Sequence, residues 1–178
     1  MKKKQILDRL WTTIEQLVNL SPRKFKYSET VAKGDLKKVC GTVCCVAGWY
    51  PKWFPESGLE YRLREISVDP SPGEVPYVYV SGNHLPMNHT LKYYHGLAHS
   101  IINFLFYGEC IYIRLSEKGE AVADEILKYW RKDIYIQIED SWYVQMKRGL
   151  NSNLAQVIMG FRFIHYMIEN DYIENYNI

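Results

Sequence analysis

Hydrophobic residues recur at spacings of three and four along the start of the chain, which predicts an amphipathic helix over residues 5–20. The positions that share its apolar face are Ile6, Leu10, Ile14, Leu17 and Val18, with Leu7, Trp11 and Leu20 widening that face. Ser21 and Pro22 follow. Because the residue before a proline avoids the helical conformation, we expect the helix to end there.

The helical period returns in three later segments. They are residues 91–106, 117–130 and the stretch from about 151 to 170. Ser116 is placed to cap the second of these helices, and Asn151 or Ser152 to cap the third. A fourth, apolar segment is predicted as a buried helix that begins near Gly41 and breaks between Gly48 and Pro51.

Short runs of strand-forming residues lie between the helices. The candidate strands are residues 61–68, 77–80, 111–115 and 134–138. Pro and Gly are concentrated in residues 55–90, which we interpret as a loop-rich insertion with short strands. Because strands and helices do not alternate regularly, the sequence predicts an α+β fold, a mainly helical single domain over residues 1–178 with a small antiparallel sheet.

Composition excludes several classes of protein. The chain has 178 residues, 47% hydrophobic and 24% charged, and its 22 Lys and Arg against 20 Asp and Glu give a net charge of +2. Disorder requires lower hydrophobicity and higher net charge, and a nucleic-acid binder would carry a stronger, clustered positive charge. Asp8 and Arg9 interrupt the sequence before any signal-peptide-like apolar run, so we expect a cytoplasmic protein with no membrane partner.

The most distinctive segment, residues 40–49, has the sequence CGTVCCVAGW. Thr42 is able to cap a helix, which would place Cys40 at the helix N-terminus, where the helix dipole lowers the pKa of a thiol. Such a position suits an activated nucleophile or an anion-binding site. Small residues beside buried cysteines also suit tight helix packing, and we favour this structural interpretation.

This segment resembles a motif, Cys-Gly-Thr-x-x-Cys-x-Ala-Gly-Trp/His, shared by a group of uncharacterised small phage and bacterial proteins. The matching residues are Cys40, Gly41, Thr42, Cys45, Ala47, Gly48 and Trp49. Tyr50 and Pro51 depart from the pattern, because the group continues with a small residue there. The resemblance covers about residues 20–55. It implies a phage or mobile-element accessory protein of the host cytoplasm, a class that includes inhibitors of host defence.

Histidines are a second set of candidate chemical groups. His95 and His99 are four residues apart, a spacing that puts two imidazoles on one helix face as metal ligands. Gly96 stands where a zinc metalloprotease has glutamate, so the HExxH signature is missing. The signatures of dinucleotide-binding, P-loop and α/β-hydrolase proteins are missing too. We expect neither a metal nor a cofactor.

Aromatic residues are abundant, with 15 Tyr, 6 Phe and 5 Trp. Lys and Arg neutralise phosphate while aromatic rings stack on bases, so this combination favours a non-enzymatic protein that binds a small anionic, nucleotide-like ligand or a host protein. The predicted ligand-binding residues are Arg23, Lys24, Lys26, Thr42, Trp49, Trp53, Tyr77, Tyr79, Tyr93 and Tyr94.

Two alternatives stay open at this point. The first is a Cys-dependent enzyme with Cys40 as the nucleophile and His95 or His99 as the base. The second is a structural or protein-interaction module, for example a homodimer formed through exposed aromatic side chains.

Overall fold

The computed structural model describes residues 1–25, 32–33, 46–64, 77–82, 84–107, 109, 111–130, 135–139, 143–147 and 153–178. The α-helices are α1 (Lys3–Val18), α2 (Val46–Trp53), α3 (Met87–His95), α4 (His99–Ile102), α5 (Glu117–Glu120), α6 (Ala123–Trp130) and α7 (Leu154–Glu169). Short helical turns of other types are η1 (Pro22–Lys24), η3 (Pro55–Ser57) and η4 (Asn103–Tyr107). The strands are β1 (Ala32–Lys33), β2 (Leu59–Arg64), β3 (Tyr77–Gly82), β4 (Ile111–Arg114), β5 (Tyr135–Glu139) and β6 (Tyr143–Lys147).

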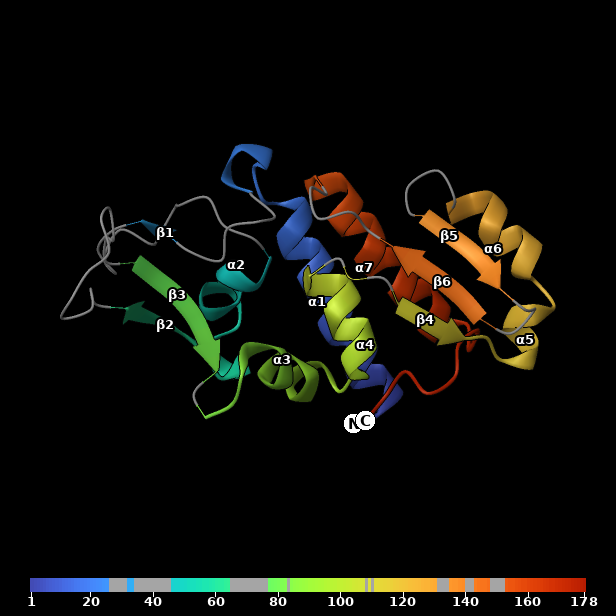
Figure 1. The fold of residues 1–178 in the computed structure, drawn as a ribbon, viewed down its shortest axis with the longest axis horizontal. Helices are drawn as coiled ribbons and strands as arrows, with labels where there is room; N and C mark the ends of the chain where they lie inside the picture. The colour runs from blue at the N-terminus through green and yellow to red at the C-terminus, as the bar shows by residue number, and fades with distance from the viewer. Residues whose placement is uncertain are drawn as a thin grey trace.

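These strands form two three-stranded antiparallel sheets, with the orders β1-β3-β2 and β4-β6-β5. Figure 1 shows the sheets at opposite ends of the molecule, with α1, α4 and α7 between them. The α+β class with antiparallel strands is therefore confirmed. The sequence predicted one small sheet, whereas the described strands form two, and α3 and α4 lie between β3 and β4 along the chain.

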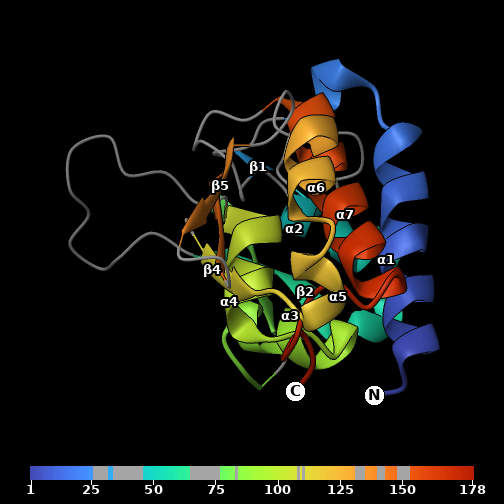
Figure 2. The same cartoon turned by 90° about the vertical axis from the view of Figure 1, so that its right-hand side faces the viewer.

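Helices α1 and α7 pack side by side through the middle of the molecule, as Figures 1 and 2 both show. The buried side chains of the two helices include Ile6, Leu10, Ile14 and Leu17 on α1 and Val157, Phe161, Ile164 and Ile168 on α7. Full burial of one such side chain stabilises the fold by about 1.5–3 kcal/mol. Two apolar residues predicted on the buried face of α1 are instead exposed, Trp11 to 49% and Val18 to 53%.

Predicted helix ends are partly confirmed. The Ser116 side chain accepts a hydrogen bond from the Gly119 N–H at 3.1 Å and so caps α5 as predicted. Asn153, rather than Asn151 or Ser152, caps α7: its side chain accepts from the Gln156 N–H at 3.0 Å, and the Gln156 side chain accepts from the Asn153 N–H. This reciprocal pair is a capping box.

The single helix predicted over residues 91–106 is wrong. Gly96 ends α3 with φ at 68°, a left-handed conformation that glycine adopts at little cost. The chain then forms an isolated bridge between Leu97 and Asn177 before α4 begins at His99. Both ends of the chain reach this turn: the Met1 side chain lies against Gly96, and the Ile178 N–H donates to the Gly96 carbonyl at 3.4 Å.

The predicted break between Gly48 and Pro51 is wrong as well, because α2 continues through both residues to Trp53. The start of this helix near Gly41 lies outside the described residues. The loop-rich region predicted over 55–90 contains η3, β2, β3 and the start of α3. None of the helices in the described part of the chain combines the length and the hydropathy needed to cross a membrane.

Candidate functional site

Some of the residues predicted to carry chemistry are not placed by the structure. Lys26, Cys40 and Thr42 lie outside the described residues, as do the other three cysteines. For Lys24, Tyr77 and Tyr79 the structure describes the backbone but not the side chain. The proposed role of Cys40 as a nucleophile therefore stays a prediction.

The two predicted tryptophans stack on each other. Trp49 and Trp53 come from successive turns of α2, and their rings are nearly parallel, with centroids 5.7 Å apart and an interplanar angle of 14°. Trp49 is only 4% exposed, and the Lys52 ammonium lies 5.6 Å from its ring centroid. In this conformation the ring of Trp49 packs inside the protein and offers little surface to a ligand.

Two of the predicted tyrosines, Tyr93 and Tyr94, lie on α3, near the first half of α1. Tyr93 is 56% exposed. The Tyr94 hydroxyl donates to Glu56 Oε1 at 2.7 Å, and the Arg9 guanidinium lies 4.3 Å from the Tyr94 ring centroid. Burial, together with the Glu56 carboxylate, raises the pKa of Tyr94 above its ordinary value.

Arg23 lies beyond the other end of α1, a helix about 24 Å long. Figure 1 shows α3 near the start of α1 and η1 beyond its end. The described members of the predicted ligand surface therefore do not form a single patch.

His95 is fully buried and belongs to a chain of hydrogen bonds between three helices. Its Nε2 lies 2.7 Å from the Tyr50 hydroxyl, which lies 2.8 Å from Thr13 Oγ1, and that hydroxyl donates to the Arg9 carbonyl at 2.9 Å. Phe106 and Tyr94 flank the imidazole ring, with centroids at 5.8 Å and 5.2 Å. These hydrogen bonds join α1, α2 and α3.

The number of available hydrogens decides which group donates in each hydrogen bond of this row. The only hydroxyl hydrogen of Thr13 goes to the Arg9 carbonyl, so Thr13 accepts from Tyr50. Tyr50 then has only an oxygen lone pair to offer, and His95 must donate to it from Nε2. His95 is therefore the Nε2–H tautomer. Its buried Nδ1 carries a lone pair and has no hydrogen-bond partner among the described residues.

This setting opposes a role for His95 as a base. Burial, reinforced by the positive charge of Arg9, lowers the pKa of His95 to about 3. A general base works best with a pKa near the operating pH. The imidazole instead fixes α3 against Tyr50 of α2.

His99 has a different environment, because the break at Gly96 puts it on α4 rather than on the helix that carries His95. The predicted shared helix face is therefore wrong. His99 Nε2 lies 2.8 Å from the Asn88 amide nitrogen, and its ring centroid is 5.3 Å from that of His89. Within the described ranges, no three or more His, Cys, Asp or Glu side chains are grouped to hold a metal ion.

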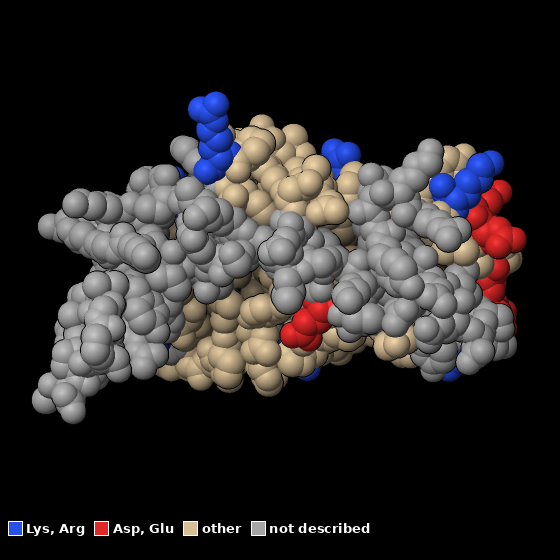
Figure 3. All heavy atoms as spheres, turned by 45° about the horizontal axis from the view of Figure 1, so that its top comes forward, with Lys and Arg blue, Asp and Glu red and all other residues tan. Residues whose placement is uncertain are grey.

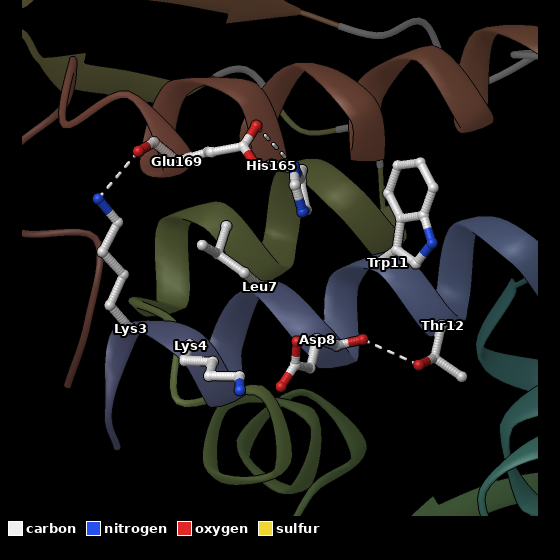
Figure 4. Close-up of a pocket in the computed structure, with 8 residues that line it drawn as sticks. All are labelled: Lys3, Lys4, Leu7, Asp8, Trp11, Thr12, His165 and Glu169. Carbon is white, nitrogen blue, oxygen red and sulfur yellow. Dashed lines mark hydrogen bonds and ion pairs between the residues drawn. The ribbon is translucent and has the colours of Figure 1, made fainter.

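A groove with a volume of about 1060 Å³ runs along α1 and α7. Figure 4 shows the side chains that line it, which are Lys3, Lys4, Leu7, Asp8, Trp11, Thr12, His165 and Glu169. Trp11 forms part of its wall, and the ring of His165 lies 5.5 Å from the Trp11 ring. The indole is held in place because Trp11 Nε1 donates to Glu15 Oε1 at 2.9 Å.

Charged groups surround one end of this α1/α7 groove. The Lys3 ammonium donates to the Asp171 carboxylate at 2.6 Å and to the Glu169 carbonyl at 3.0 Å, which ties the start of α1 to the end of α7. The Glu169 carboxylate lies 3.7 Å from His165 Nδ1. Lys4 and Asp8 are exposed, and neither forms an ion pair within the described part of the chain.

The α5–α6 end of the molecule carries more acidic side chains than basic ones. Figure 3 shows acidic side chains gathered at the α5–α6 end, next to a few basic ones. A smaller pocket of about 370 Å³ there is lined in part by Glu120, Asp124 and Glu125. The lining of the α1/α7 groove is balanced, with Lys3 and Lys4 against Asp8 and Glu169, so it opposes an anionic ligand less than the acidic α5–α6 end does.

The prediction from sequence missed this groove because it placed Trp11 on the apolar face of its helix. One signal could have found it: Lys4, Asp8 and Trp11 are spaced i, i+4 and i+7, so a cation, a carboxylate and an aromatic ring share one side of α1.

Comparisons with known proteins add no further constraint. No protein-family model matches the chain, and the searches of curated proteins and of solved structures gave no match. The resemblance of residues 40–49 to the phage and bacterial motif stays a prediction.

Proposed function

We propose that the protein is a non-enzymatic binding protein that takes a small anionic ligand in the α1/α7 groove. The observation that supports this best is Trp11, a residue that is 49% exposed in the wall of a groove of about 1060 Å³. Concave sites with an aromatic wall and a few charged groups are where small ligands bind. Stacking on an exposed ring is worth about 1–3 kcal/mol for a nucleic-acid base.

The charges at the start of α1 support an anion as the ligand. Lys2, Lys3 and Lys4 lie at the positive end of the helix dipole, and the first turn contains no acidic residue. Each positive charge there destabilises an exposed helix by about 0.3–1 kcal/mol. Asp171 offsets the charge of Lys3, but Lys4 has no ion-pair partner within the described ranges. A bound anion would relieve this repulsion.

The biological role that fits this proposal is sequestration. A protein that binds a small anion without a catalytic group removes the ligand from other proteins, as an inhibitor of host defence does when it removes a nucleotide signal. The motif resemblance supports a phage or mobile-element origin for such a role.

Thermal unfolding of the full chain with a panel of anions tests the proposal. The probes are inorganic phosphate, pyrophosphate and the common mononucleotides. A ligand of the folded state stabilises it by about 2.7 kcal/mol at a concentration roughly one hundred times Kd. We expect stabilisation by at least one probe in the wild-type chain and its loss in Trp11→Ala.

Tyr129→Ala is the matched control, because Tyr129 is 72% exposed on α6, away from the groove. It should respond to ligand as the wild type does. Absence of stabilisation by every anion in the panel would contradict the proposal, and so would an equal loss in both variants.

A further inference from the structure

The α1/α7 groove contains three chemically different groups in one row along α1. Lys4, Asp8 and Trp11 all line the groove. At 100° per residue, their spacing places them within about 60° of one another around the helix. Lys4 and Trp11 are separated by about 10 Å along the helix axis, with Asp8 between them. Figure 4 shows the Lys4 and Asp8 side chains near each other on the side of α1 away from α7, and Trp11 further along the helix with its ring towards α7 and His165.

We propose that the ligand of this groove is a nucleoside phosphate, with its phosphate at Lys4, its ribose at Asp8 and its base on Trp11. This inference rests on the proposed function, because it names the class of anion that the groove binds. Each of the three contacts follows from the chemistry of one side chain.

Lys4 supplies the phosphate contact. Its ammonium is a compact charge with three donors, a good match for phosphate oxygens. Lys3, one residue earlier, is already held by Asp171 and by the Glu169 carbonyl, so the two lysines are not equivalent. The adjacent helix N-terminus adds a favourable field for an anion at the same place.

Asp8 supplies the ribose contact. An ionised carboxylate only accepts hydrogen bonds, and the two adjacent hydroxyls of a ribose are donors that suit it. Thr12 does not occupy this carboxylate, because its hydroxyl donates to the Asp8 backbone carbonyl at 2.8 Å. Asp8 would repel a phosphate placed over it. It therefore fixes the direction of the ligand along α1.

Trp11 supplies the base contact. Its indole N–H is already bonded to Glu15, so the ring presents its face rather than a donor. A stacking contact of this kind accepts any base, because every base has a flat aromatic face. The groove therefore selects for ribose and phosphate rather than for one particular base.

Isothermal titration calorimetry on the full chain tests this assignment. The probes are the four common ribonucleoside 5′-monophosphates, adenosine, 2′,3′-dideoxyadenosine 5′-monophosphate and inorganic phosphate. We expect at least one monophosphate to bind about tenfold more tightly than inorganic phosphate, because the base stacks on Trp11. The dideoxy analogue should bind about fivefold more weakly than adenosine monophosphate, because it lacks both hydroxyls that Asp8 accepts from.

Variants assign each contact. Lys4→Ala should reduce the preference for adenosine monophosphate over adenosine. Asp8→Ala should remove the preference for adenosine monophosphate over its dideoxy analogue. Trp11→Phe should retain most of the affinity that Trp11→Ala loses. Lys128→Ala, Asp124→Ala and Tyr129→Ala on α6 are the matched controls and should behave as the wild type.

The two proposals fail in different ways. Equal affinity for inorganic phosphate and for every monophosphate, or an unchanged hydroxyl preference in Asp8→Ala, would overturn the nucleoside assignment and leave the anion site standing. A complete lack of binding by every phosphate-containing probe would overturn the proposed function itself. Far-ultraviolet circular dichroism of each variant separates a loss of binding from a loss of fold, and we expect every variant to keep the helical signal of the wild type.

Discussion

The two sides of helix α1 differ in how completely their polar groups are satisfied. On the inner side, Thr13 is buried and bonded to Tyr50, which is bonded in turn to His95. On the outer side, Trp11 is half-exposed, and Lys4 and Asp8 form no ion pair within the described residues. The inner side has the features of a structural contact, and the outer side those of a surface available to a ligand.

The difference shows that the charges of α1 are not arranged to stabilise the helix itself. Three lysines at the start of α1 oppose the helix dipole, and the stability of the helix comes instead from the apolar residues that it buries against α7. Departures from local preference that bring no stability are most common at functional sites. Four measurements test this comparison, from the largest expected effect to the smallest.

Acidification should cause the largest loss of stability, and it acts through His95, which is bonded to the inner side of α1 by way of Tyr50. His95 has a pKa of about 3 in the folded chain, against about 6.5 when unfolded. As the pH falls, the unfolded chain takes up the proton on His95 before the folded chain does. The stability that neutral His95 contributes is therefore complete above pH 6.5 and is lost as the pH falls towards 3. The full loss is about 5 kcal/mol. Urea unfolding at pH 7 and pH 4 measures the part of this loss that falls in that range, about 3 kcal/mol.

His95→Gln is the control for this experiment. The variant should be less stable at pH 7, but the part of the pH dependence that belongs to His95 should disappear from it. The same steep loss of stability between pH 7 and pH 4 in wild type and variant would show that His95 is not buried as a neutral imidazole.

Tyr50→Phe should lower the free energy of unfolding by about 2–3 kcal/mol, because it leaves the buried His95 Nε2–H without an acceptor and takes the donor from Thr13. Tyr129→Phe, at a residue that is 72% exposed, should change stability by less than about 0.5 kcal/mol. Chemical denaturation of both variants measures the difference. A Tyr50→Phe protein as stable as the wild type would break the proposed hydrogen-bond chain.

Two adjacent threonines sharpen the comparison further. Thr12 and Thr13 make the same local hydrogen bond, at 2.8 Å and 2.9 Å, to the carbonyl four residues earlier. Only Thr13 also accepts from a buried tyrosine. Thr13→Val should cost about 1–2 kcal/mol, because Tyr50 loses its acceptor, whereas Thr12→Val should stay within about 0.5 kcal/mol of the wild type. Equal effects would mean that the two sides of α1 are not distinct.

Lys4→Gln should give the smallest effect, and its sign is opposite to the others. Removing a positive charge from the start of α1 should raise the free energy of unfolding by about 0.3–0.5 kcal/mol at low ionic strength, and salt should reduce the gain. Lys128→Gln is the matched control, because Lys128 lies in the last turn of α6, where a positive charge is favourable. This control should be destabilised slightly.

Sequence patterns predicted those parts of the fold that depend on neighbours along the chain. The apolar period gave α1 and α7, and Ser116 identified the start of α5. The break at Gly96 was missed because the apolar residues that follow it, Leu97, Ile101 and Leu105, keep a helical spacing. The pairing of β6 between β4 and β5 depends on contacts between distant segments, which periodicity does not contain.

The candidate site was harder to predict for the same reason. The partner that buries His95 is Tyr50, 45 residues earlier, so residue type and local spacing could not separate a buried imidazole from a base or a metal ligand. Trp11 has the hydrophobicity of a core residue, and only the packing of α7 against one side of α1 decides that its ring is left in the groove wall.

The two ends of the chain meet at one glycine turn, and this has a mechanical consequence. Met1 packs on Gly96, and Ile178 bonds to its carbonyl. Tension applied between the termini would therefore act first on these few contacts and then on the ion pair between Lys3 and Asp171. The long interface of α1 with α7 would carry load only after those contacts had separated.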